Sequence, residues 1–245
     1  MLWLYVEAPF AVCRTFTAGW YRPTATFLTP SAAYGLLLNF AGIDSRLREG
    51  EEGHDGKTPA TLTVKGLPAM KLILGAAGED RRGKPIPFDE ALPRMQSVYQ
   101  QLHNYPVGAS GKERAAGCFG SKYNIAPVRR EFLTDLRAVI GVDADDGILD
   151  RIRRGLAGEF PRYGVPFLGD NNFLLDRAEL RDSPIPAYWY QPVTAADTGP
   201  QPRTARLTIA IDRADLSRTT SQLFAPSSET SVTPPNDAWI TIPGT

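Results

Sequence analysis

The stretch FLTPSAAYGLLLNFAGI, residues 27–43, carries the marks of one amphipathic helix with a start and a stop. Its apolar residues recur at i, i+3, i+4, i+7 and i+8, and this spacing aligns them on the side of a helix that faces a core. These positions are Ala33, Leu36, Leu37, Phe40 and Ala41. Thr29 or Ser31 can cap the first turn, where Pro30 is tolerated. We therefore predict a core helix that ends at Gly42.

Short apolar runs around this helix predict strands. LWLYVE at residues 2–7 and MKLIL at 70–74 are aromatic or aliphatic, as in buried strands. Further strands are expected at 173–175, at 207–211 and, as a possible edge strand, at 238–242.

A second amphipathic helix is expected at residues 145–158, with Asp143 or Asp145 as its cap. Its apolar stripe consists of Ile148, Leu149, Ile152 and Leu156. The chain between these elements is polar, glycine-rich or proline-rich and predicts exposed or irregular structure. Such segments are found at 44–60, 75–89 and 219–235.

The middle of the chain predicts an extended hairpin. NIAPVRREFLTDLRAVIGV at residues 124–142 alternates as a strand does, and the glycine-rich, basic stretch at 108–122 suits a tip. QSVYQQLHNYPV at 96–107 fits either a helix, by its spacing, or a strand, by its aromatic content and closing proline. Strand, tip and strand together favour the hairpin.

The order strand, helix, strand, hairpin, helix, strand indicates an α+β fold. It matches a ferredoxin-like, RRM-like palm, in which an antiparallel sheet carries its helices on one face, with an extended β-hairpin as a thumb. We assign residues 1–218 to the palm, with the thumb inserted at about 96–142, and 219–245 to a Ser/Thr/Pro-rich C-terminal segment.

The composition restricts the class of partner. The 245 residues include 27 Lys and Arg and 27 Asp and Glu, so any nucleic-acid site must be a local patch. Cys13 and Cys118 form no CxxC pair, which argues against a disulfide scaffold or a zinc site. The apolar start lacks a basic leader, and no run is long enough to span a bilayer. We expect a cytoplasmic protein with no membrane partner and no cofactor.

Few residues suggest catalysis. His54 lies in a polar loop, whereas His103 lies beside Asn104 and could stack on a base, act as a general base on a ribose hydroxyl, or be a histidine satisfied on the sheet surface. No phosphate-loop, dinucleotide-binding or HExxH motif occurs. Asp143, Asp145 and Asp146 could bind a metal, but helix capping explains them more simply.

Two basic-aromatic clusters are stronger signals. Residues 111–137 contain six cations and three carboxylates, among aromatic residues that suit unstacked bases. The cations are Lys112, Arg114, Lys122, Arg129, Arg130 and Arg137. The second cluster precedes the first helix, whose unpaired N–H groups could meet a phosphate. Its residues are Arg14, Phe16, Trp20, Tyr21 and Arg22, of which Phe16 and Trp20 could instead be core residues.

Three stretches resemble the CRISPR-associated Cas-five family. FLTPSAAYGLLLNFAGI is similar to its first-helix signature, NIAPVRREFLTDLRAVIGV to its "PVRREFL" strand, and RYGVPFLGDNNFLLD at 162–176 to its glycine-containing loop. The sequences YQQLHNYPVGASG and GWYRPTATF are most similar to the DevS-like, or Cmx, branch of type I systems. The match covers roughly the first 180 residues in compatible order.

The resemblance implies a subunit of a Cascade-type surveillance complex in antiviral defence or RNA-guided DNA targeting. Such a subunit holds the 5′ handle of the CRISPR RNA and contacts the Cas-seven backbone subunit and the Cas-eight large subunit. It meets target DNA through the complex, where base pairing reads the sequence. The candidate RNA-binding residues are Arg14, Phe16, Trp20, Tyr21, Arg22, Ser31, Tyr34, His103, Asn104, Lys112, Arg114, Lys122, Arg129, Arg130, Tyr163 and Gly169.

One branch of the family cuts its own precursor RNA without metal. His103 as base and Lys122 as a charge-stabilising group would fit that activity, and they form the alternative catalytic pair. The DevS-like resemblance instead implies a system with a separate nuclease. We therefore expect no catalysis, with a metal-independent endoribonuclease as the alternative. A third possibility is a scaffold whose basic patch binds an acidic protein.

Overall fold

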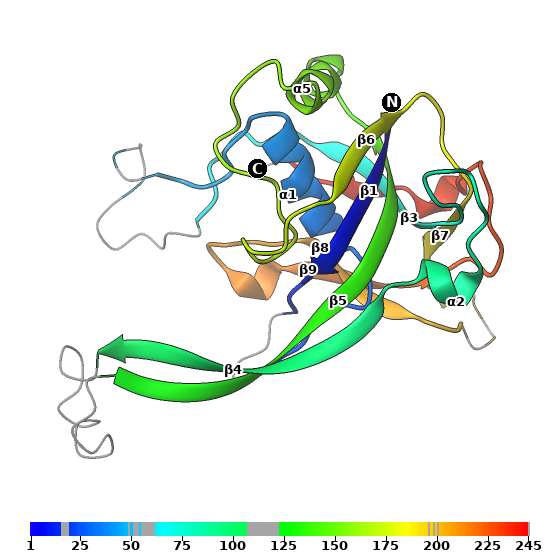
Figure 1. Ribbon diagram of the computed structural model, residues 1–245. Coiled ribbons are helices and arrows are strands. Elements are labelled where there is room, and N and C mark those ends of the chain that lie inside the picture. The colour runs from blue at the N-terminus through cyan, green and yellow to red at the C-terminus, as the bar shows by residue number, and fades with distance from the viewer. Residues whose placement is uncertain are drawn as a thin grey trace.

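The computed structural model describes residues 1–15, 20–48, 50, 54, 62–106, 123–195, 197, 199 and 201–244. For residues 101–106 and 123–126 it describes the backbone alone. The chain forms one body built around a sheet, and a long two-stranded arm leaves it (Figure 1).

The body is organised around β1 (Leu2–Ala11), the first strand. β1 lies between β6 (Arg177–Arg181) and β5 (Tyr123–Asp143), and β3 (Met70–Ala77) pairs with the far side of β5. The order is β6-β1-β5-β3, and every pair is antiparallel. α1 (Pro30–Phe40) follows β1 in the chain, and α5 (Asp146–Leu156) lies between β5 and β6. The structure is therefore a mostly antiparallel α+β fold.

The remaining strands extend the sheet past β3. β7 (Ala187–Pro192) pairs with β3, β9 (Thr220–Pro226) with β7, and β8 (Ala205–Ala210) with β9. β10 (Ile240–Ile242) also pairs with β3. The short helices are α2 (Phe88–Ala91), η2 (Leu216–Arg218) and η3 (Asn236–Ala238).

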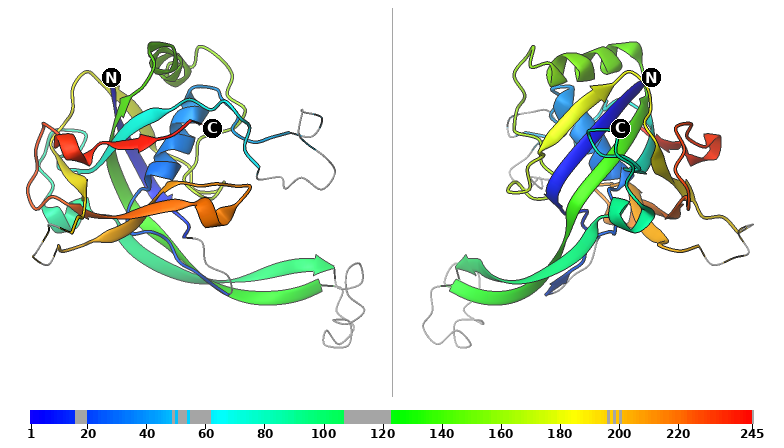
Figure 2. Two further views of the ribbon diagram at one scale, coloured as in Figure 1. Left: turned by 180° about the vertical axis from the view of Figure 1, so that it is seen from behind. Right: turned by 45° about the vertical axis from the view of Figure 1, so that its right-hand side comes forward.

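The two long helices cover one face of the sheet (Figure 2). α1 (Pro30–Phe40) is capped by the Thr29 hydroxyl, which accepts from the Ala32 N–H at 3.2 Å. In α5 (Asp146–Leu156), the carboxylate of Asp145 accepts from the Gly147 N–H at 2.8 Å. Both caps are among those predicted.

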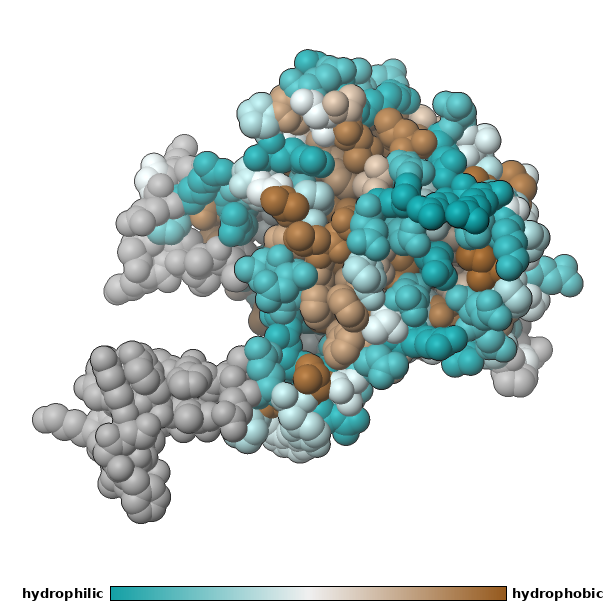
Figure 3. Space-filling view, viewed as in Figure 1, coloured by the Kyte–Doolittle hydropathy of each residue, from teal (hydrophilic) through white to brown (hydrophobic). Residues whose placement is uncertain are grey.

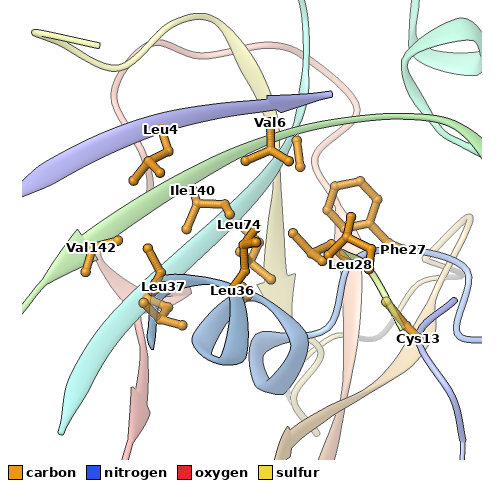
Figure 4. Close-up of a cluster of buried hydrophobic side chains, with 14 of the residues drawn as sticks. Leu4, Val6, Cys13, Phe27, Leu28, Leu36, Leu37, Leu74, Ile140 and Val142 are labelled. Atoms are coloured by element: carbon orange, nitrogen blue, oxygen red, sulfur yellow. The ribbon is translucent and has the colours of Figure 1, made fainter. Parts of the chain in front are cut away.

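The main core lies between α1 and the sheet. Figure 4 shows Leu36 and Leu37 of α1 facing Leu4, Leu74 and Ile140 of three strands. All five apolar positions of the predicted α1 stripe are at most 3% exposed. α1 is more buried than the stripe predicted, because Leu38 and Asn39 are also buried. The reason is that α1 also packs against β8 and β10, outside the central strands.

A second apolar cluster covers part of the opposite face. Trp3 meets Trp189 and Trp239 edge to face, with ring centroids 6.1 and 6.0 Å apart. A Cβ on Gly141 would lie 2.4 Å from the Trp3 ring, so this residue must remain small. The sheet is therefore buried on both faces at this end.

In both β1 and β5, the set of alternate residues that points into the core changes near Pro9. Ala8 and Leu136 point into the core, as do Ala11 and Leu133, so the alternation of each strand slips once between them. Asp135, in register opposite Pro9, has a φ of 58° and supplies the change in β5. The slip turns Phe10 outward, where it is 44% exposed.

Beyond this point β5 leaves the body as the second strand of the arm. Its partner is β4 (Arg94–Pro106), which pairs with it antiparallel from Arg94↔Thr134 to Pro106↔Tyr123. The stretch that fitted helix or strand is therefore a strand. The range of 96–142 expected for the thumb includes both the arm and the half of β5 that pairs with β1.

Three other expectations differ from the structure. The strand expected at 173–175 is reduced to one isolated bridge, Phe167↔Leu174, because the chain turns back there. The stretch 219–235, expected to be irregular, contains β9, whose Phe224 is fully buried. The proline-rich, aromatic segment 183–202, for which no strand is expected, contains β7, with Pro184 and Pro186 before the strand and Pro192 at its end. Among the described residues, no helix is long and apolar enough to cross a membrane.

Candidate nucleic-acid interface

Three segments meet where the arm leaves the body, and we call this place the hairpin root. They are the chain after β1 (residues 12–15 and 20–25), the paired strands around residue 130, and the loop 163–174. Each of the three segments contains an arginine or directly follows one. The fold therefore brings together cations that are far apart in the sequence.

β2 (Tyr21–Arg22) attaches the first segment to β5 as a short parallel strand. Tyr21 pairs with Arg129 and Arg22 with Arg130, and the Arg129 N–H donates to the Trp20 carbonyl at 2.8 Å. The Arg129 guanidinium lies over the Tyr21 ring, 5.6 Å from its centroid. Trp20, Tyr21 and Arg22 are all exposed. Trp20, Tyr21 and Arg22 of the predicted pre-helix cluster therefore lie beside Arg129 and Arg130 of the predicted arm cluster.

Glu131 lies beneath this surface, where it is only 8% exposed, and holds the segment after β1 in place. Its carboxylate accepts from the Tyr21 hydroxyl and, at 3.3 Å, from the Thr24 N–H. The hydrogen bond to Glu131 raises the pKa of Tyr21, because the phenol must stay protonated to donate. Thr24 in turn accepts from the Cys13 N–H at 2.9 Å. The segment after β1 is therefore held to the arm by its buried polar groups.

Arg130 connects the arm to the loop 163–174. Its guanidinium donates to the Asp170 carboxylate at 2.6 Å and to the Gln100 side chain at 2.8 Å. The side chains of Arg130 and Asp170 are each 16% exposed. The hydrogen bond from Arg130 lowers the pKa of Asp170, and the charge of Arg14 adds to that effect.

Gly169 holds the same loop against the end of β1. It has a φ of 80°, and a Cβ there would lie 1.8 Å from the Val12 carbonyl oxygen. The Val12 N–H donates to the Leu168 carbonyl at 3.0 Å. Only glycine allows this approach. Gly169, predicted as a contact residue, shapes the site through its backbone.

The residues that lead into the first turn of α1, the turn predicted to face a phosphate, are buried. Thr29 is 3% exposed, and its hydroxyl lies 3.2 Å from that of Ser31. Phe27 and Leu28 are fully buried and pull this end inward. The phosphate contact at this turn stays a prediction.

Two further candidates have their partners outside the root. The Tyr34 hydroxyl donates to the Pro68 carbonyl at 2.8 Å, and burial raises its pKa to about 12. Tyr163 is 40% exposed and carries the Arg46 guanidinium 6.0 Å from its ring centroid. The loop beside Tyr163 is fixed to α1, because the Asn39 amide donates to the Gly164 carbonyl at 3.1 Å.

The structure leaves other candidates untested. Phe16, Lys112, Arg114 and Lys122 lie outside the described residues. His103 and Asn104 belong to β4, where the backbone alone is described. Among the described residues, no group of three His, Cys, Asp or Glu side chains is arranged to hold a metal ion.

Sequence reasoning missed the apolar part of the root. Phe10, Phe132 and Phe173 come together there from three segments, with Arg130 beside them. The sequence did indicate Phe132, because it lies two residues after Arg130 and therefore on the same face of β5. Phe10 had none, because the slip at Pro9 cannot be read from a two-residue period.

Comparison with known proteins gives a fold likeness. No family model and no curated protein matches the sequence. One solved structure, titled "CRISPR RNA-guided surveillance complex", matches with a TM-score of 0.51 and 12% identity, over 97% of this chain and 95% of that chain. Another, titled "Crystal structure of Cas protein", matches with a TM-score of 0.43 and 14% identity, over 96% and 99%. The first likeness extends over nearly the whole fold.

Proposed function

We propose that this protein is a non-catalytic RNA-binding subunit of a CRISPR surveillance complex. The observation that supports it best is the hairpin root, where the Arg129 guanidinium lies over the exposed Tyr21 and where Arg22 lies in register beside Arg130. Arginines attract phosphates, and flat rings accept unstacked bases, so this surface suits a single strand of RNA.

Arg129 in particular is arranged for a ligand. Its Nε is buried without a hydrogen-bond acceptor among the described residues, although its guanidinium is fixed over Tyr21. A buried N–H group without an acceptor destabilises the folded protein, unless a ligand or a water molecule accepts its hydrogen bond. A phosphate oxygen is a suitable acceptor, because arginine binds phosphates with several N–H groups at once.

The architecture supports a Cas-five assignment within that class. The order β6-β1-β5-β3, with a helix in each of the two crossovers, is the arrangement of a ferredoxin-like palm. The arm of β4 and β5 corresponds to a thumb. We propose a cytoplasmic type I subunit of the RAMP superfamily, in the DevS-like branch, that caps the 5′ handle of the CRISPR RNA. The Cas-seven backbone subunit and the Cas-eight large subunit are its proposed protein partners.

Salt-dependent RNA binding tests the assignment of the arginines. We expect Arg22→Gln and Arg129→Gln each to weaken binding of a labelled handle RNA to the full chain. Each should also reduce the slope of log affinity against log salt, by about 0.7 for each phosphate that the variant no longer neutralises. The matched control is Arg153→Gln, which removes an exposed arginine from α5 at the opposite end of the body (Figure 1). Equal affinities and slopes for all four proteins would contradict the proposal.

The rival function is a metal-independent endoribonuclease using His103 and Lys122. Incubation of repeat RNA with the wild type and with His103→Ala in EDTA separates the two. We expect both proteins to leave the RNA intact. Cleavage by the wild type that His103→Ala abolishes would replace our proposal with the rival.

A further inference from the structure

A small apolar pocket opens at the hairpin root, on the face of the arm that carries Arg130. Its volume is about 260 Å³. The lining residues are Phe10, Val12, Val98, Arg130, Glu131, Phe132 and Phe173. That volume is several times the ~30 Å³ that one water takes in the liquid, so the pocket is larger than a site for a single water. The pocket therefore has room for one flat group.

Three phenylalanine rings shape this pocket. The Phe10 centroid lies 5.8 Å from that of Phe132 and 5.7 Å from that of Phe173, and the last two are 6.1 Å apart. The interplanar angles range from 39° to 67°, so the rings form inclined walls and do not fill the space by stacking on one another. The free ring faces remain available to a further flat group.

The apolar lining lies partly in water. Phe10 is 44% exposed, and Val98 of β4 is 49% exposed. The slip opposite Asp135 is what turns Phe10 outward. Figure 3 shows apolar surface continuing down the face of the body to the base of the arm, between hydrophilic areas. An exposed apolar patch of this kind indicates a binding site.

Cations surround the same face. Arg22 pairs in register with Arg130, and paired residues of neighbouring strands point to the same side. Arg14 lies near enough to Asp170 for its charge to act on that carboxylate. Asp170 is already paired with Arg130, and neither Arg14 nor Arg22 has a carboxylate partner among the described residues. The pocket is therefore apolar inside and has an excess of positive charge at its edge.

We propose that this pocket seats one unstacked nucleobase of the bound RNA, while Arg14 and Arg22 hold the adjacent phosphates. The inference rests on the proposed function and adds a subsite to it. A base fits better than a protein side chain, because the cationic edge needs a partner that is both flat and anionic. Stacking on rings accepts any base, so the subsite positions the strand and reads little sequence.

Abasic RNA tests the pocket directly. The probe is a series of labelled handle RNAs, each lacking the base at one position, bound to the full chain. We expect one position at which removal of the base weakens binding to the wild type by about tenfold. Phe10→Leu and Phe173→Leu, which keep an apolar side chain, should each weaken binding of the intact RNA by a similar factor. In both variants the base at that position should no longer matter.

Phe167→Leu is the matched control, because Phe167 is in the same loop, is 46% exposed and does not line the pocket. We expect it to bind like the wild type. Thermal unfolding checks that all variants fold. A different result separates the two proposals. If the leucine variants bind intact RNA more weakly, but removal of the base still lowers their affinity by the same factor as in the wild type, the pocket proposal fails. The proposed function stands in that case.

Two other results would also overturn the pocket. If the leucine variants bind RNA normally but fail to assemble with a protein subunit, the occupant is a protein side chain. If the wild type binds no handle RNA at all, the proposed function fails and the pocket proposal with it.

Discussion

Arg130 donates to Asp170 at 2.6 Å, and this ion pair joins the arm to the loop that precedes β6. The two residues are 40 positions apart in the sequence. Because each side chain is largely buried, neither is a freely moving surface charge. The pair fixes the direction in which the arm leaves the body, and the stability that it gives should depend on pH.

Replacing Asp170 with Asn should destabilise the fold at neutral pH. Hydrogen bonds to charged groups contribute about 1.5–3 kcal/mol, so a loss of that order is expected. Arg130 lowers the pKa of Asp170 in the folded state, so its stabilising effect is complete above the unfolded pKa of about 3.9 and is lost as the pH falls through the folded value. Urea unfolding of both proteins from pH 7 to pH 2 measures this. A difference that does not shrink in acid would refute the assignment.

The positive φ of Asp135 predicts opposite effects for two substitutions. Asp135→Gly should change the free energy of unfolding by less than about 1 kcal/mol, since glycine adopts this conformation easily. Asp135→Val should cost about 1–3 kcal/mol, because a β-branched residue is strained there. Thr134→Val, at the neighbouring extended position, is the control and should be tolerated. Urea unfolding compares all three, and equal stability of the two Asp135 variants would count against the slip.

Two glycines of the helices should respond oppositely to alanine. A Cβ on Gly155 would lie 1.7 Å from the Phe40 carbonyl oxygen, so Gly155→Ala must push α5 away from α1. We expect a loss of about 1–3 kcal/mol. Gly35 has nothing within 4 Å of an added Cβ, so Gly35→Ala should stabilise α1 by about 0.5–1 kcal/mol. Thermal unfolding measures both, and a neutral Gly155→Ala would contradict the close helix contact.

Local patterns predicted much of the body of the fold, and the helix α1 shows why. Its stripe, its Thr29 cap and its Gly42 stop are all local, and the structure contains each of them. The arm was harder to predict. Residues 94–100 of β4 are exposed on both faces, so no alternation of buried and exposed residues separated strand from helix.

The site was predictable in its parts but not in its assembly. Arg14, Tyr21 and Arg129 were recognised as two separate clusters by composition, and β2 is what unites them. The pairing of Arg130 with Asp170 is long-range, and nothing near either residue indicates it. The phosphate site expected at the first turn of α1 stays a prediction, and the buried Phe27 and Thr29 lie directly before that turn.

Binding to RNA of defined sequence tests the central claim most directly. The measurement is the affinity of the full chain for RNA with its own repeat-derived 5′ handle, against scrambled RNA of the same length at the same salt. We predict several-fold tighter binding of the handle, which Arg129→Ala together with Arg130→Ala reduces. Equal affinity for both RNAs, unchanged by those substitutions, would contradict the assignment of this protein as a handle-binding subunit.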